Sequence, residues 1–157
     1  MLIGIGKCYH LEYKAMLLAV AIIAFCYPVW AEIPAPLHIN NAWIKMAPPG
    51  AAVNAAYAEL YNPGNKPLVI SGLSSTCCAT LMLHRTVYKN DKAMMEHVDT
   101  LTIPAAKQVD LKPGDLHIML LQSESPFHLG DEIAIQLLFA DGQQQTVYFP
   151  VKVNGND

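Results

Sequence analysis

Charge is scarce in this sequence, and neither sign of it is concentrated. Only 15% of the 157 residues are charged, with 10 basic and 13 acidic side chains. No basic patch is present, which argues against nucleic acid or an anionic membrane surface as a partner. The chain is also too short for several large domains, so we expect one globular domain and not a multidomain enzyme.

Cysteine is equally scarce and is badly spaced for a disulfide scaffold. Two of the four cysteines, Cys8 and Cys26, lie in the N-terminal segment, and the other two, Cys77 and Cys78, are adjacent. Adjacent cysteines cannot close a loop, so the fold must depend on its hydrophobic core. The pair can be one buried and one partly exposed thiol, a strained vicinal disulfide or an auxiliary ligand for a soft metal, and the sequence leaves these alternatives open.

Enzyme signatures are absent from the sequence. There is no G-x-S-x-G, no H-E-x-x-H, no phosphate-binding glycine loop and no C-x-x-C. Hydrolase and dehydrogenase activities are therefore not expected, and we predict that the protein is not an enzyme.

The one long apolar run lies near the N-terminus. Lys7 and Lys14 precede an apolar stretch over residues 15–26, and small residues suitable for a signal peptidase follow it. The stretch is shorter than the roughly 20 residues that span a bilayer. We therefore predict a cleaved signal peptide over residues 1–31, export to the periplasm, and a mature domain over residues 32–157 with no stable membrane span. An uncleaved N-terminal anchor is the alternative.

The rest of the chain has the pattern of an all-β protein, since short apolar runs alternate with Pro, Gly, Asn and Asp. The expected strands are residues 37–45, 55–61, 68–74, 80–88, 93–98, 108–111, 116–121, 132–139 and 145–153. The clearest hairpin signal is the turn at Asp141-Gly142. Short strands at spacings near ten residues, without an internal repeat, favour a Greek-key sandwich or a small barrel.

Histidine and methionine gather in one window of the mature chain, and only His38, Met46 and His128 lie outside it. The window contains Met82, His84, Met94, Met95, His97, His117 and Met119. Thioether is a soft, uncharged ligand that binds Cu(I) well, and imidazole suits both oxidation states of copper. Neither is lost to disulfide formation in an oxidising compartment. The set therefore favours a carrier of Cu(I) outside the cytoplasm.

Two pairs in this window have the spacing of ligands on one face of a strand. His117 and Met119 are two residues apart, so both project from the same face, and Met82 and His84 repeat the arrangement in reverse order. A single Met is core filler more often than a ligand, and a lone His is more often a surface or core residue. The pairing of unlike soft ligands on two strands is what indicates a metal site, and Met82 is expected to be a core residue beside it.

The expected strands over residues 80–88 and 93–98 are predicted to form a hairpin, with its turn at residues 89–92. If Asn90-Asp91 forms a two-residue loop, His84 lies opposite His97 and is a diagonal neighbour of Met95. A longer or shorter loop changes this pairing, and the sequence does not decide between them.

The order His84, Met95, His117, Met119 resembles the His-x10-Met-x21-His-x-Met pattern of the periplasmic copper chaperone family PCu(A)C. The resemblance covers about residues 37–153. It includes the segments Ala42-Trp43-Ile44, Pro48-Pro49-Gly50, Ala55-Ala56-Tyr57, Asn62, Leu111-Lys112-Pro113-Gly114 and Leu116-His117-Ile118-Met119-Leu120. It implies a cupredoxin-like Greek-key β-sandwich whose exposed site binds one Cu(I) through these two His and two Met.

The resemblance also implies what happens to the copper. The partner would be a copper-accepting assembly protein or a cytochrome c oxidase subunit, and the carrier would be a monomer that supplies cytochrome c oxidase copper-centre assembly. Met94 and His97 are spare ligands on the hairpin. Two alternatives stay open, a metal-free secreted β-sandwich that acts as an interaction or assembly module, and a blue-copper electron carrier that uses Cys78.

Overall fold

The computed structural model describes residues 37–48 and 50–155, and this part of the chain is built from strands alone. The strands are β1 (His38–Lys45), β2 (Val53–Tyr61), β3 (Leu68–Ser74), β4 (Cys78–Lys89), β5 (Lys92–His97), β6 (Leu101–Ile103), β7 (Gln108–Leu111), β8 (Leu116–Ser123), β9 (Glu132–Phe139) and β10 (Gln144–Lys152). Among these residues no helix could cross a membrane. The all-β prediction is confirmed, whereas the signal peptide predicted over residues 1–31 lies outside the described residues.

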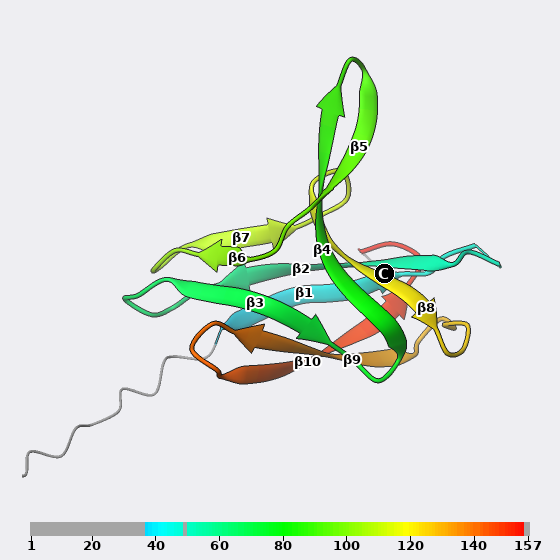
Figure 1. The fold of residues 1–157 in the computed structure, drawn as a ribbon. Coiled ribbons are helices and arrows are strands. Elements are labelled where there is room, and N and C mark those ends of the chain that lie inside the picture. Colours follow the sequence, from blue (N-terminus) through cyan, green and yellow to red (C-terminus); the bar gives the residue numbers. More distant parts are fainter. Residues whose placement is uncertain (1–36, 49, 156–157) are drawn as a thin grey trace, which may run out of the picture. The chain divides into compact units, whose positions relative to one another are not determined.

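The strands form one hydrogen-bonded sheet that folds over into two layers (Figure 1). One layer has the order β5-β4-β8-β2-β1, and the other has the order β10-β9-β3-β6. The layers join where β1 pairs in parallel with the end of β10, at Ile44 and Val151. Strand β2 pairs with β8 along its first half and with β7 along its second half. Most neighbours in the sheet are not consecutive in the chain, as in a Greek key, so the predicted sandwich is confirmed.

The core lies between the two layers and follows from the alternation of side chains along each strand. In β8, Leu116, Ile118 and Leu120 are buried in the core, and the residues between them lie on the opposite face of the sheet. From the second layer, Ile135 and Phe149 pack into the same cluster. The inner face of β8 is therefore apolar, which leaves its outer face for other chemistry.

The structure adds one strand, β6, to those that the sequence predicts. It has only three residues, in which Leu101 and Ile103 are buried and Thr102 is exposed, so it is too short for a recognisable period. Asn62, which is fully buried, holds it in place, since its Nδ2 donates hydrogen bonds to the carbonyl oxygens of Ile103 and Lys66 at 3.0 and 2.8 Å. A buried amide thus ties the turn after β2 to β6.

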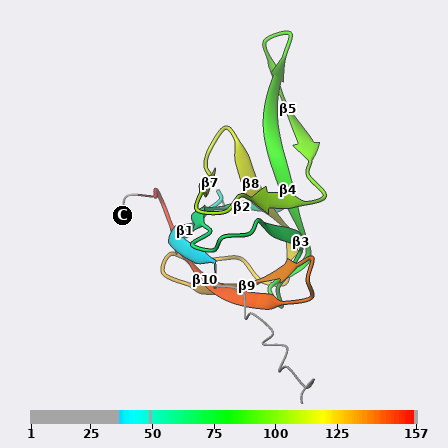
Figure 2. The same cartoon turned by 90° about the vertical axis from the view of Figure 1, so that its left-hand side faces the viewer.

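Strands β4 and β5 continue beyond the sandwich as a two-stranded arm (Figures 1 and 2). The pairing of β4 with β8 ends at Arg85, whereas the pairing of β4 with β5 runs from His84 to Lys89. All six residues of β5 are exposed. The predicted His and Met window therefore falls where this arm leaves the sheet.

Candidate metal centre

A tight turn sets the register of the arm. Asn90 and Asp91 form a two-residue loop with φ angles of 51° and 60°, both in the left-handed region. This is the pattern of a type I′ turn, whose twist matches that of the flanking strands. Lys89 then pairs with Lys92, and His84 pairs with His97. The register is the one that the sequence predicts for a two-residue loop.

Strand β8 brings the second ligand pair to β4. His84 lies directly opposite His117, and Met82 lies directly opposite Met119. Because side chains alternate along a strand, these four side chains share one face of the sheet. Leu83 and Ile118, which lie between them, are buried in the core on the other face. The four side chains therefore lie on the outer face of the first layer.

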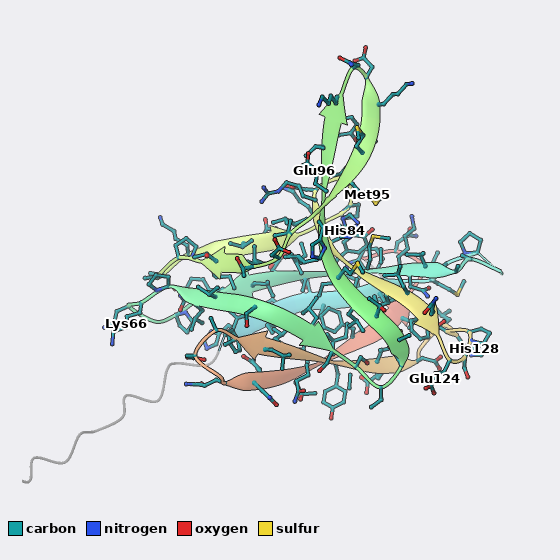
Figure 3. All side chains as sticks on the ribbon, viewed as in Figure 1. Lys66, His84, Met95, Glu96, Glu124 and His128 are labelled. Atoms are coloured by element: carbon teal, nitrogen blue, oxygen red, sulfur yellow. The ribbon has the colours of Figure 1, made fainter. Side chains whose placement is uncertain are left out.

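Of the four predicted ligands, Met95 is the only one outside the β4–β8 pair. It lies opposite Thr86 on the arm, diagonal to His84, and is 59% exposed. Figure 3 shows Met95 on the arm beyond His84. Met94 lies opposite Val87 and therefore projects from the other face of the arm. Its place as a spare ligand of the same site is not supported.

The prediction that Met82 belongs to the core is corrected by the structure. Its side chain is only half-buried and is not among the apolar residues that form or flank the core cluster. The reason is the register of β4 with β8, which puts Met82 on the outer face opposite Met119. Met82 is thus a further thioether at the edge of the site.

The imidazoles differ in what their ring nitrogens contact. His117 is buried, and its Nδ1 lies 2.9 Å from the backbone oxygen of Asp115, which leaves Nε2 for a metal. The Nδ1 of His84 is buried and has no hydrogen-bond partner. A buried nitrogen without a partner is costly unless another group satisfies it. The ring centroids of the two residues are 6.3 Å apart, so this nitrogen fits a site where a metal ion supplies the missing partner.

The protonation state of His84 also suits a metal ligand. Burial lowers the pKa of His84 below the usual range for imidazole, and the neighbouring rings of His97 and His117 lower that pKa further. Metal ions bind the neutral ring and compete with protons for its lone pair. At neutral pH the ring therefore presents a lone pair without first losing a proton.

Two aromatic residues that the sequence does not single out as site residues border the buried side of the centre. Tyr57 lies 6.5 Å from the ring of His117, and Trp43 packs on Tyr57 with ring centroids 4.9 Å apart. Burial raises the pKa of Tyr57, which keeps its hydroxyl protonated. The chain near its C-terminus approaches Trp43 so closely that a Cβ on Gly155 would be 2.9 Å from the indole. Only the fold brings Tyr57 beside His117, with Trp43 packed on Tyr57.

The adjacent cysteines lie at the start of β4, away from the His pair. Cys78, which is buried, pairs with Ser123, four rungs of the sheet ladder before Met82 pairs with Met119. Burial, and then the neighbouring Cys77, raise the pKa of Cys78 to about 12, so it is a poor thiolate ligand at neutral pH. Within residues 37–48 and 50–155, no three His, Cys, Asp or Glu side chains are grouped to hold a metal ion. A blue-copper set of one Cys and two His is therefore not assembled there.

Known relatives cover most of this chain. The family described as "Putative lipoprotein LpqE-like" matches residues 37–151. The protein named "Putative lipoprotein Lxx21020" of Leifsonia xyli subsp. xyli is 34% identical over 143 residues, which are 88% of this chain and 85% of that protein.

Solved structures with the same fold include copper-bound ones. The solution structure of CuI-DR1885 from Deinococcus radiodurans is 29% identical, with a TM-score of 0.64, over 78% of this chain and 83% of that one. The copper-bound PCuAC domain from PmoF2 is 18% identical, with the same TM-score of 0.64, over 76% of this chain and 95% of that domain, which is a likeness of fold. From its sequence match over residues 37–151, this chain belongs to the LpqE-like (PCuAC) family.

Proposed function

We propose that this protein is a periplasmic copper chaperone that binds one Cu(I) through His84, Met95, His117 and Met119 and passes it on without catalysing a reaction. The observation that carries the proposal is the facing pair of His84 and His117 on the outer face of the sheet, with one buried nitrogen left without a partner. Thioether sulfurs lie on the same face, and this mixture of imidazole and thioether favours Cu(I) over Zn(II), Mg(II) or Ca(II).

The exposure of the ligands suits a carrier rather than a permanent metal centre. His117 is 5% exposed and anchors the site at the sheet, whereas Met95 is 59% exposed on the arm. All four ligands are neutral when they bind, so an acceptor can replace them one at a time without separating charge. A shallow site of this kind lets copper leave when a partner offers its own ligands.

The destination and the compartment are further parts of the proposal. A copper-accepting assembly protein or a cytochrome c oxidase subunit would receive the ion for oxidase copper-centre assembly, as the resemblance to PCu(A)C implies. Export agrees with the signal-like segment over residues 1–31 and with the relative from Leifsonia xyli named as a lipoprotein. Transfer can be tested by mixing the Cu(I)-loaded protein with the soluble copper domain of an oxidase subunit, with and without an assembly protein, separating the two proteins and measuring the copper bound to each.

A competition titration against a bathocuproine-type Cu(I) chelator tests the binding site. We expect one Cu(I) per wild-type chain and loss of tight binding when His84, Met95, His117 and Met119 are replaced together by Ala. The matched control replaces His38, Met46 and His128, which lie outside the window, and we expect it to bind as the wild type does. If the wild type and the fourfold variant compete equally poorly, the protein is a metal-free β-sandwich module and the proposal is wrong.

A further inference from the structure

A third imidazole stands next to the proposed copper site. His84 lies between two other rings, with its centroid 6.3 Å from that of His117 and 5.6 Å from that of His97. An imidazole nitrogen binds a metal ion at about 2.0 Å, so two rings that share an ion have centroids about 5–6.5 Å apart, from a tetrahedral to a linear arrangement. Each pair therefore has a spacing that suits one shared ion, with His84 common to both.

The three rings do not form a single three-histidine site. Across the described part of the chain, no three His, Cys, Asp or Glu side chains are close enough to hold one ion together. The two outer rings, His97 and His117, lie on strands β5 and β8, on opposite sides of β4. Copper can thus use one outer ring or the other, but not both in this arrangement.

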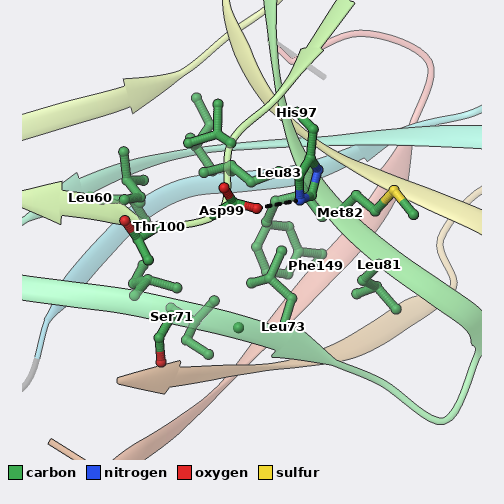
Figure 4. Close-up of a pocket in the computed structure, with 17 residues that line it drawn as sticks. Leu60, Ser71, Leu73, Leu81, Met82, Leu83, His97, Asp99, Thr100 and Phe149 are labelled. Carbon is green, nitrogen blue, oxygen red and sulfur yellow. Dashed lines mark ion pairs between the residues drawn. The ribbon is translucent and has the colours of Figure 1, made fainter. Parts of the chain in front are cut away.

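A carboxylate lies beside one ring nitrogen of His97. Its Nε2 lies 3.2 Å from the Oδ1 of Asp99, at the rim of the cavity between the layers (Figure 4). Metal-binding imidazoles typically donate their second ring N–H to a carboxylate or a carbonyl, which sets the ring orientation. With the proton on Nε2, the Nδ1 of His97 is left as the lone-pair nitrogen. His117 has the equivalent arrangement with the carbonyl of Asp115.

The two alternative positions of copper, beside His117 or beside His97, differ in their exposure to solvent. His117 is 5% exposed, whereas the side chain of His97 is 51% exposed at the end of β5. Met95, the thioether on the same arm, is also exposed. An ion held by His84, Met95 and His97 would lie nearer to the solvent than an ion held by His117 and Met119.

We propose that His97 is an exchange ligand through which Cu(I) leaves the site, an inference that rests on the proposed function. The bonds from copper to the nitrogen of His117 and the sulfur of Met119 break as a bond to Nδ1 of His97 forms, while His84 stays bound. All of these ligands are neutral, so copper remains Cu(I) and no proton or electron moves. The acceptor then replaces His84, Met95 and His97 from the solvent side.

A rate measurement separates this role from ordinary ligation. Cu(I)-loaded protein is mixed with excess bathocuproine disulfonate in a stopped-flow instrument, and the affinity is measured separately at equilibrium. We expect His97→Ala to slow the transfer at least tenfold while its Kd stays within about threefold of the wild-type value. Asp99→Asn keeps the ring but removes the carboxylate that orients it, so it should slow the transfer by a smaller factor.

His128 provides the matched control. Like His97 it is an exposed histidine beside an aspartate, with its Nδ1 3.6 Å from Asp131, and it lies in the connection between β8 and β9, away from the arm (Figure 3). His128→Ala should transfer copper at the wild-type rate. Circular dichroism of each variant verifies that the fold is kept.

The outcomes are distinguishable. If His97→Ala transfers copper as fast as the wild type or faster, the exchange role is wrong, although the protein can still be a copper carrier. If His97→Ala loses affinity as strongly as His117→Ala does, His97 is a ligand of the resting ion and the exchange role is also wrong. If the wild type itself binds no Cu(I), the proposed function fails, and this inference fails with it.

Discussion

The turn of the arm should control the proposed copper site from a distance, and this can be tested without touching a candidate ligand. Asn90 and Asp91 both have left-handed backbone conformations, which Asn, Asp and Gly adopt more readily than other residues. A left-handed L-residue costs about 1–2 kcal/mol in general, and since Asn and Asp already bear part of that cost, replacing both by Ala should destabilise the turn by about 1–2 kcal/mol in total.

The consequence follows from the isolation of the arm. All six residues of β5 are exposed, and a lone two-stranded hairpin is marginally stable. A loss of about 1–2 kcal/mol in turn stability should therefore open the hairpin in a large fraction of the molecules. Met95 then leaves the site, while His84, His117 and Met119 stay in place on β4 and β8. Since 1.4 kcal/mol is a factor of about ten in an equilibrium, the Kd for Cu(I) should rise about 5- to 30-fold.

The assay combines a chelator competition with amide hydrogen exchange of β5. Asp91→Gly is the control, because Asn-Gly is the preferred pair for a type I′ turn, and we expect it to bind copper at least as tightly as the wild type. If the double Ala variant loses amide protection in β5 and still binds Cu(I) with wild-type affinity, the arm does not contribute a ligand. If β5 keeps its protection, the energetic argument about the turn is refuted.

Three further predictions use other features of the structure. Replacing Met95 by Leu should weaken Cu(I) binding about tenfold, whereas Met94→Leu, on the opposite face of the same strand, should leave the affinity unchanged in the same titration. Asn62→Ala removes three hydrogen bonds from a fully buried residue, so urea denaturation should show a loss of about 2–4 kcal/mol with unchanged copper affinity. Iodoacetamide at pH 8 should modify Cys77 well before Cys78, because the pKa of Cys78 is raised to about 12. Mass spectrometry of peptides measures the two rates, and preferential labelling of Cys78 would contradict the prediction.

Local patterns explain how much of the fold could be predicted. Alternating apolar residues and the turn residues between them mark every strand except β6, and the strand β9 has the bounds that the sequence predicts, residues 132–139. The sequence places the turn of the arm at residues 89–92 but leaves the loop length open, and the structure shows the two-residue loop and its register. Strand β6 was not predicted, because three residues before Pro104 are too few to show an alternating apolar pattern. Its position depends on the buried Asn62.

The candidate site could be predicted only in part. The residue types and their spacing select His84, Met95, His117 and Met119, since two residues two apart on a strand must share a face. Whether Met82 faces the core or the site, and whether Met94 or Met95 faces His84, depends on strand register. The rings of Trp43 and Tyr57 reach the site through pairing of β1, β2 and β8, for which no local signal exists.

The sequence by itself therefore determined the all-β class and the set of candidate ligands, because side-chain alternation depends on neighbours in the chain. Only the tertiary structure decided that His117 lies opposite His84 and that one nitrogen of His84 is buried without a partner. The pairing of β4 with β8 joins segments more than 25 residues apart, and it is selected by the burial of Leu83, Ile118 and Leu120 in a common core. The hydrophobic core on one face of the sheet thus places the proposed metal ligands on the other.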